Sequence, residues 1–222
     1  MHSPHLPLDI LRSSHWVFDL DGTLTVAIHD FAQIRQELGI PEGDDILVHL
    51  AGLPSSEALR KQERLLEIEL ELAGRTEPAP GAVDLVTALS RRGAHMGVLT
   101  RNTRGNALRT LERIGVLPYL DHADVLGRDE ARAKPDPDGI LQLAAKWGTH
   151  PERVVMVGDY RFDLETGRAA GAATVHVDTT RSFRWPELTD LAVGSLAELG
   201  GALLETGAGI RRAVPVRRRR SG

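Results

Sequence analysis

Residues 19–25 read Asp-Leu-Asp-Gly-Thr-Leu-Thr, and this heptad begins inside the apolar run His15–Leu20 (HWVFDL). The run predicts a buried strand. A turn at Gly22 can bring the carboxylates of Asp19 and Asp21 toward one pocket. An Asx turn that closes the strand would explain one aspartate and the glycine, but not the whole heptad. The heptad therefore predicts a functional site at the end of the first strand.

Three further polar segments lie at the ends of strands or at the start of a helix. They are Thr100-Arg101-Asn102, Lys134-Pro135-Asp136-Pro137, and Gly158-Asp159 with Asp163. Each segment alone is also typical of a helix cap, a rigid turn or a surface lysine. Together with the heptad they supply a hydroxyl, a cation and four carboxylates, which indicates one polar site.

Short apolar runs alternate with helical patterns along most of the chain. The runs with strand character are His15–Leu20, His95–Leu99, Ala123–Leu126, Arg153–Val157 and Ala173–Val177. The helical patterns between them occupy residues 82–92, 103–114, 139–147 and 163–170. This alternation predicts an α/β fold with a parallel five-stranded sheet, and the continuous apolar strands fit a sheet covered on both faces.

One insertion without a strand interrupts the alternation after the first strand. It contains three helical patterns, Asp30–Leu38, Asp44–Leu50 and Ser55–Gly74, and it ends at the Pro-rich segment Glu77–Pro80. We predict a small all-helical cap at residues 29–78. The Rossmann-like core would then comprise residues 14–28 and 79–207, and residues 208–222 are expected to form a basic, disordered tail.

The composition is that of an ordinary globular protein and excludes several kinds of site. The chain has 222 residues, 41% of them hydrophobic and 26% charged, enough for one sizeable domain with an appendage. It has no cysteine, which removes disulfides, thiolate nucleophiles and cysteine–zinc sites. No apolar run is long enough to cross a membrane, and the first residues do not resemble a signal peptide, so we expect a cytoplasmic protein.

The charge is distributed unevenly. Six arginines lie between Arg211 and Arg220, whereas the rest of the chain carries 21 basic and 31 acidic residues. An acidic body is a poor platform for nucleic acid, and the arginine-rich end is the one feature that points to such a partner. The body can still bind a single phosphate group if a divalent metal supplies positive charge. The charge balance therefore argues against a nucleic-acid partner for the body of the chain.

The four segments together resemble the motifs of the haloacid dehalogenase superfamily of hydrolases. The motifs are Asp19–Thr25, Thr100, Lys134-Pro135, and Gly158-Asp159 with Asp163. The chain looks most similar to phosphoglycolate-phosphatase-like members with a helical cap after the first strand, from about Trp16 to Leu204. The resemblance implies the strand order 3-2-1-4-5, with the ligand at the switch point between the first and fourth strands.

The resemblance also implies a magnesium-dependent phosphatase whose partner is a small phosphorylated metabolite, and it gives each motif residue a role. Asp19 would be the nucleophile and Asp21 the general acid. Mg²⁺ would be held by the Asp19 carboxylate, the Asp21 carbonyl, Asp159 and Asp163. The phosphate would be held by the Thr100 hydroxyl, the Lys134 ammonium and the backbone amides of Leu20 and Gly22. Arg101 and Asn102 are the two further phosphate-binding residues that the resemblance implies.

Several alternatives remain at this stage. Dehalogenating members lack the second aspartate, which Asp21 supplies here, and Lys61 is the one cap lysine that a phosphonate-cleaving enzyme could use. We interpret Lys61 as part of a solvated helix face and His29 as an ordinary hinge residue. A phosphomutase and a non-catalytic binding protein stay open. Because the predicted cap is short, sugar phosphates and nucleotides are alternatives to phosphoglycolate.

Overall fold

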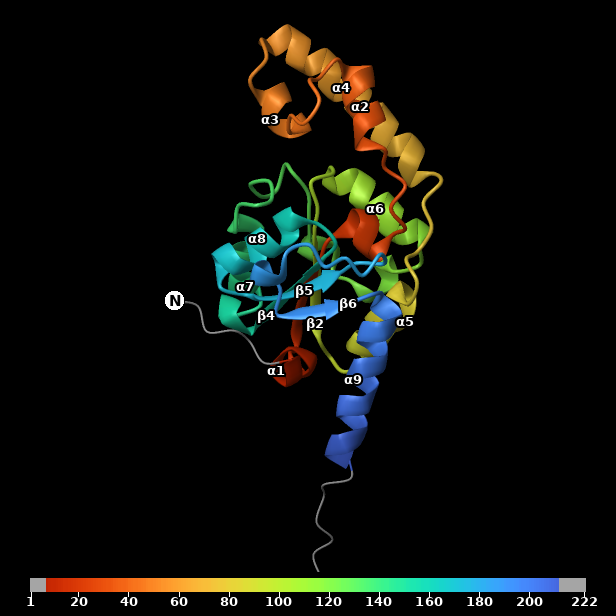
Figure 1. The fold of residues 1–222 in the computed structure, drawn as a ribbon, viewed down its shortest axis with the longest axis vertical. Coiled ribbons are helices and arrows are strands. Elements are labelled where there is room, and N and C mark those ends of the chain that lie inside the picture. Colours follow the sequence, from red (N-terminus) through yellow and green to blue (C-terminus); the bar gives the residue numbers. More distant parts are fainter. Residues whose placement is uncertain (1–6, 212–222) are drawn as a thin grey trace, which may run out of the picture.

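The computed structural model describes residues 7–211, which form a three-layer core with a helical cap above it (Figure 1). The strands are β1 (His15–Phe18), β2 (His95–Leu99), β3 (Val125–Leu126), β4 (Val154–Gly158), β5 (Ala173–Val177) and β6 (Leu191–Val193). The core helices are α1 (Pro7–Arg12), α5 (Ala82–Arg91), α6 (Arg104–Arg113), α7 (Asp138–Lys146), α8 (Arg161–Ala170) and α9 (Leu196–Arg211).

The six strands form one parallel sheet in the order β3-β2-β1-β4-β5-β6. The predicted α/β class and the order of the first five strands are confirmed. The sixth strand was missed because its apolar run, Leu191–Val193, has only three residues, of which only Val193 is buried. β1 ends at Phe18 rather than at the predicted Leu20, because the chain turns tightly over Leu20–Leu24.

Alternate residues of the strands face opposite layers of helices, as the pleat of a sheet requires. Trp16 and Phe18 belong to a core cluster with α1, α5, α6 and α9, whereas Val17 belongs to a second cluster with α7. All three side chains are fully buried. The two-sided burial explains why the strands read as continuous apolar runs.

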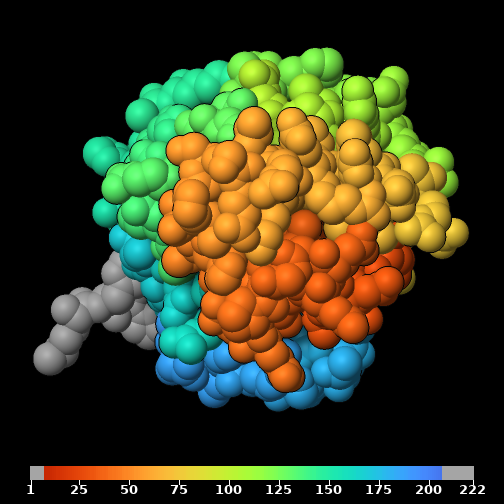
Figure 2. All heavy atoms as spheres, turned by 90° about the horizontal axis from the view of Figure 1, so that it is seen from above, coloured from red at the N-terminus to blue at the C-terminus, as the bar shows by residue number. Residues whose placement is uncertain are grey.

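The cap consists of α2 (Phe31–Leu38), α3 (Ile46–Ala51) and α4 (Ser55–Ala73). The three helices share a small apolar cluster in which Leu65 and Ile68 of α4 pack against Ile34 and Leu50. On the other side of α4, Leu59 is exposed. Seen from above, α2, α3 and α4 cover the end of the core (Figure 2).

Two chain segments connect the cap to the core side by side. Val26 donates its backbone N–H to the carbonyl of Glu77 at 3.0 Å, and Ala79 donates to Leu24 at 2.9 Å. Thr25 and Pro78 form an antiparallel bridge. This pairing joins residues 24–26 to residues 77–79, and the cap boundaries at residues 29 and 78 stay a prediction.

The last helix continues further than the sequence suggests. α9 runs from Leu196 to Arg211, past the predicted end of the core at residue 207. Residues 212–222 of the predicted basic tail lie outside the described residues. Within residues 7–211, no helix has both the length and the apolar character needed to cross a membrane.

Candidate active site

The site lies where β1 and β4 end, next to each other in the middle of the sheet. Asp19 follows β1 directly, and its backbone N–H donates to the carbonyl of Val157 in β4 at 2.9 Å. Asp159 follows the last residue of β4, and Asp163 lies in the first turn of α8. Parallel strands present their carboxyl ends at one edge, so residues distant in sequence converge there.

Three carboxylates form the centre of this site. Asp19, Asp159 and Asp163 each offer an oxygen, and these oxygens lie within 4.8 Å of one another. Asp19 and Asp163 are 7% and 2% exposed. Carboxylates this close repel one another strongly when ionised and shielded from water, so the group needs positive charge nearby.

Lys134 supplies part of that charge. Its Nζ donates to Asp163 Oδ1 at 2.5 Å and also contacts Asp19 Oδ1, and the lysine is almost completely buried. Burial alone would lower the pKa of Lys134, but the carboxylates of Asp163 and Asp19 raise it above its usual value. The ammonium group is therefore charged and links the first and fourth motifs.

The turn after β1 holds Asp159 in place. Thr23 Oγ1 donates to Asp159 Oδ1 at 2.8 Å. Gly22 has a φ of 92°, and a Cβ atom added there would lie 2.6 Å from Asp159 Oδ2. The glycine of the heptad is thus required both by the backbone conformation and by the close approach of a carboxylate. Thr23 was not among the predicted site residues, although it belongs to the heptad.

The carboxylate cluster has more negative charge than Lys134 can balance. Burial raises the pKa of Asp159 to about 8, and the charges of Asp19 and Asp163 add to this effect. Burial likewise raises the pKa of Asp163 to about 6. Among the described residues, Asp159 has no basic partner within 4 Å. An oxygen-rich group with a deficit of positive charge fits a hard divalent cation such as Mg²⁺.

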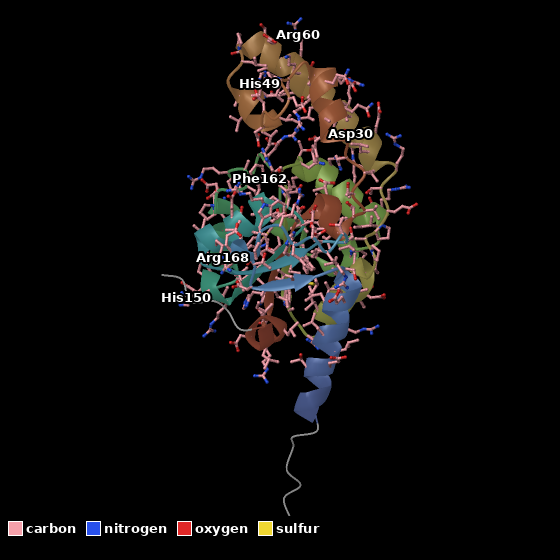
Figure 3. The ribbon with its side chains drawn as sticks, in the orientation of Figure 1. Asp30, His49, Arg60, His150, Phe162 and Arg168 are labelled. Carbon is pink, nitrogen blue, oxygen red and sulfur yellow. The ribbon has the colours of Figure 1, made fainter. Side chains whose placement is uncertain are left out.

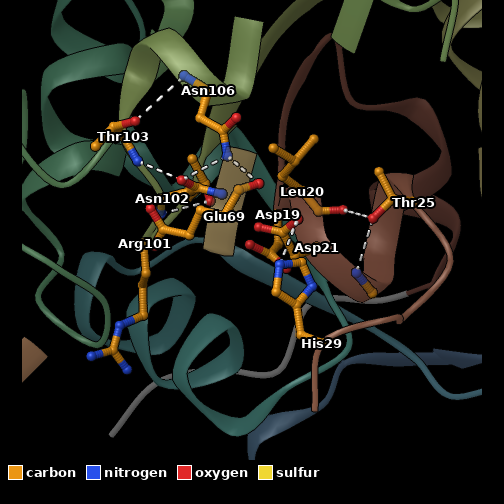
Figure 4. A network of polar contacts seen from close by, with 12 residues as sticks. Asp19, Leu20, Asp21, Thr25, His29, Glu69, Arg101, Asn102, Thr103 and Asn106 are labelled. Carbon is orange, nitrogen blue, oxygen red and sulfur yellow. Dashed lines mark hydrogen bonds and ion pairs between the residues drawn. The ribbon is translucent and has the colours of Figure 1, made fainter. Parts of the chain in front are cut away.

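Asp21 is not part of this group of three carboxylates and lies next to His29 (Figure 4). Burial raises the pKa of Asp21 to about 6, while Lys134 and a hydrogen bond from the Asn102 side chain lower it in part. Asn102 is nearly fully buried, as is Thr100, whose Oγ1 accepts the backbone N–H of Asn102 at 3.1 Å. The loop after β2 therefore reaches the same site as the heptad.

Arg101 extends away from Asp19 and toward the cap (Figure 4). Its guanidinium donates to Asp45 Oδ1 at 2.6 Å and lies 4.9 Å from the centre of the Phe162 ring. Phe162 is on the part of the core that faces the cap (Figure 3). The role of Arg101 as a phosphate ligand stays a prediction, and so does that of Leu20.

Glu69 of the cap and Arg128 of the core join the site without having been singled out in the sequence, and His29, interpreted there as an ordinary hinge residue, joins them. Glu69 of α4 accepts hydrogen bonds from Arg128, which follows β3, at 2.6 and 3.1 Å. His29 Nε2 lies 3.8 Å from Asp21 Oδ1. Arg128 and Glu69 are 59 residues apart, and neither belongs to a motif. The hinge position of His29 was the one available signal.

Replacing Gly22 by alanine is expected to destabilise the fold more than the same change at Gly43. Both glycines have positive φ, 92° and 86°, which costs alanine ~1 kcal/mol or more. The space around Gly43 is open, whereas Gly22→Ala must also displace Asp159 from Thr23, a further loss of ~1 kcal/mol. Denaturant unfolding of both variants measures the difference, and equal losses would contradict the close packing of Gly22 against Asp159.

The chain matches the family model of haloacid dehalogenase-like hydrolases over residues 15–171. It is 31% identical to an N-acetylmuramic acid 6-phosphate phosphatase of Pseudomonas aeruginosa, with 75% of this chain and 82% of the relative covered. It is 27% identical to a phosphoglycolate phosphatase of Mesorhizobium japonicum, with 73% and 81% covered.

A solved hydrolase structure from Pseudomonas syringae has the same fold, with a TM-score of 0.71 at 24% identity. The alignment covers 87% of this chain and 98% of that one. The matched family segment begins at β1 and ends after α8, so it contains all four predicted motifs. The expected family is thereby confirmed: the chain belongs to the haloacid dehalogenase-like hydrolases, and it is an enzyme of that family.

Proposed function

We propose that this enzyme is a magnesium-dependent phosphatase that hydrolyses a small phosphate monoester through an aspartyl-phosphate on Asp19. The observation that carries the proposal is the buried group of Asp19, Asp159 and Asp163 with Lys134 at the ends of β1 and β4. The two relatives described above are named phosphatases, which supports the same reaction class.

The carboxylates of Asp19, Asp159 and Asp163, with the backbone carbonyl of Asp21, would hold Mg²⁺. A bound Mg²⁺ supplies the positive charge that lets a carboxylate approach a phosphate dianion. Lys134 contributes a second positive charge, which contacts both Asp19 and Asp163. The raised pKa values of Asp159 and Asp163 support this assignment, because they arise from burial and from repulsion by Asp19, and a bound cation would offset both effects.

In the first half of the reaction, a carboxylate oxygen of Asp19 attacks phosphorus, and the bond from phosphorus to the leaving alcohol breaks. Asp21 gives its proton to the leaving oxygen. A carboxyl that must hold a proton benefits from a raised pKa, and burial raises that of Asp21 to about 6. Its place beside the site, separate from the three clustered carboxylates, suits this role.

In the second half, the ionised Asp21 takes a proton from water, and the water oxygen attacks phosphorus of the aspartyl-phosphate. The bond between phosphorus and Asp19 breaks, which releases inorganic phosphate and restores both side chains. We assign the phosphate oxygens to the Thr100 hydroxyl, the Lys134 ammonium and the amides of Leu20 and Gly22, with Asn102 as an orienting group.

The test is phosphate release from a panel of small monoesters, with Mg²⁺ and with a chelator. We expect release with Mg²⁺ and at least ~100-fold less with the chelator, because charge neutralisation at the transferring group is worth several kcal/mol. Isomerised product without free phosphate would indicate a mutase. If folded, Mg²⁺-loaded protein releases phosphate from none of the monoesters, that result would argue against the proposal. The expected cytoplasmic location stays a prediction.

A further inference from the structure

Asp21 marks the side of the site where the leaving alcohol must lie, because a general acid has to reach the oxygen that it protonates. The inference drawn from this rests on the proposed function. Asp21 is flanked by His29 from the hinge and Glu69 from the cap (Figure 4). Burial raises the pKa of the Glu69 carboxyl, and the neighbouring Asp21 and His29 also influence it. The leaving alcohol therefore meets a cap carboxylate close to its reacting oxygen.

The guanidinium of Arg128, which lies beside Glu69, is already neutralised by that carboxylate. Arg128 donates to both oxygens of Glu69, at 2.6 and 3.1 Å, and the two side chains are only 15% and 10% exposed. A desolvated guanidinium that is fully paired with a carboxylate has no net charge left to attract an anionic ligand. Arg128 therefore does not offer a binding site to a carboxylate of the substrate.

The second guanidinium between core and cap is also paired, through a single hydrogen bond. Arg101, next to Thr100, donates to Asp45 at the start of α3, and its planar face lies against Phe162. Both ion pairs run from a core arginine to a cap carboxylate. The cap thus meets the core with two carboxylates, and each one occupies a cation that could otherwise bind an anionic substrate.

The whole cap is acidic as well. Residues 29–78 contain eleven acidic and five basic residues, a net charge of −6. Two of the five basic residues are engaged by cap carboxylates: Lys61 pairs with Glu57, and Arg64 with Glu67 and Glu37. The phosphate group of a substrate would be neutralised by the metal and Lys134. The negative field of the cap disfavours a further negative charge on the rest of the substrate.

We propose that the natural substrate has a leaving alcohol without negative charge, recognised through its hydroxyl groups, and that Glu69 is the residue that determines this specificity. The chemical class is that of sugar and polyol phosphates. A substrate hydroxyl can donate to the Glu69 carboxylate, whereas a substrate carboxylate in the same place would find no donor and no free cation, because Arg128 is already paired with Glu69. The prediction separates this enzyme from one that acts on phosphoglycolate.

Two esters with the same two-carbon skeleton test the proposal. In 2-hydroxyethyl phosphate the end group is a hydroxyl, and in phosphoglycolate it is a carboxylate. We expect kcat/KM to favour 2-hydroxyethyl phosphate by ~10-fold or more in the wild-type enzyme. An equal or higher value for phosphoglycolate would overturn the proposal.

The variant Glu69→Gln tests the residue. It removes the negative charge and leaves Arg128 free to attract an anion, so the preference should fall by ~5-fold or more. Glu71→Gln, an exposed position on the same helix, is the matched control and should leave the preference unchanged. An equal preference in wild type, Glu69→Gln and Glu71→Gln would refute the role of Glu69.

If Glu69→Gln fails to fold, Asp45→Asn provides a second test in the same direction, because it frees Arg101 while asparagine still caps α3. Dissociation constants of both esters for Mg²⁺-loaded Asp19→Asn, measured by calorimetry, separate recognition from turnover. Tighter binding of 2-hydroxyethyl phosphate without turnover by the wild type would refute the reaction and keep the specificity. Turnover by the wild type, together with equal dissociation constants of the two esters for Asp19→Asn, would refute the proposed specificity and keep the proposed reaction.

Discussion

Asp19→Asn is expected to abolish phosphate release, with a loss on the order of 10⁴-fold or more. An amide cannot form the acyl phosphate on which both halves of the proposed reaction depend. The substitution keeps the size of the side chain and relieves repulsion with Asp159 and Asp163, so the fold should persist. Steady-state phosphate release and thermal unfolding, measured together, separate lost chemistry from lost structure.

The matched control is Asp84→Asn, which makes the same chemical change on the exposed surface of α5. It should retain wild-type activity. A labelled ester adds a direct readout, because acid-quenched wild type should carry protein-bound phosphate and Asp19→Asn should not. Undiminished phosphate release from Asp19→Asn would refute the covalent mechanism, whatever its effect on stability.

The sequence predicts the catalytic end of the sheet well, because the strand, the turn and the motif there are each specified by consecutive residues. The run before Asp19 is buried on both faces of the sheet, so nearly every residue of β1 has to be apolar. The turn at Gly22 leaves a visible mark because no other residue adopts its φ without strain next to Asp159. β5, predicted at Ala173–Val177, is observed with the same bounds.

Other features leave little local trace. β6 and α1 are short, and their buried residues are too few to create a period. The pairing of Glu69 with Arg128 depends on how α4 lies on the core, and nothing near either residue in the sequence distinguishes it from a solvated charge. The pairing of Arg101 with Asp45 likewise depends on the placement of the cap. The motif residues could therefore be predicted from the sequence, whereas the ion pairs on which the proposed specificity depends could not.

Asp21→Asn is expected to slow the hydrolysis of alkyl phosphates by ~10²- to 10⁴-fold, the range typical of losing a positioned acid. Asparagine keeps the shape of the side chain but has no proton to give to a poor leaving group. An aryl phosphate, whose phenolate leaves without protonation, should still transfer its phosphate to Asp19. Because water activation also depends on Asp21, the aspartyl-phosphate should then accumulate.

The distinguishing measurement is the first turnover. With an aryl phosphate, Asp21→Asn should release a burst of about one equivalent of phenolate, followed by slow steady-state turnover. With an alkyl phosphate it should show no burst, since the first step is itself slowed. If the variant transfers phosphate from both esters with the same fractional loss in the first step, Asp21 does not protonate the leaving group. Its raised pKa would then reflect burial beside the cap without a part in the reaction.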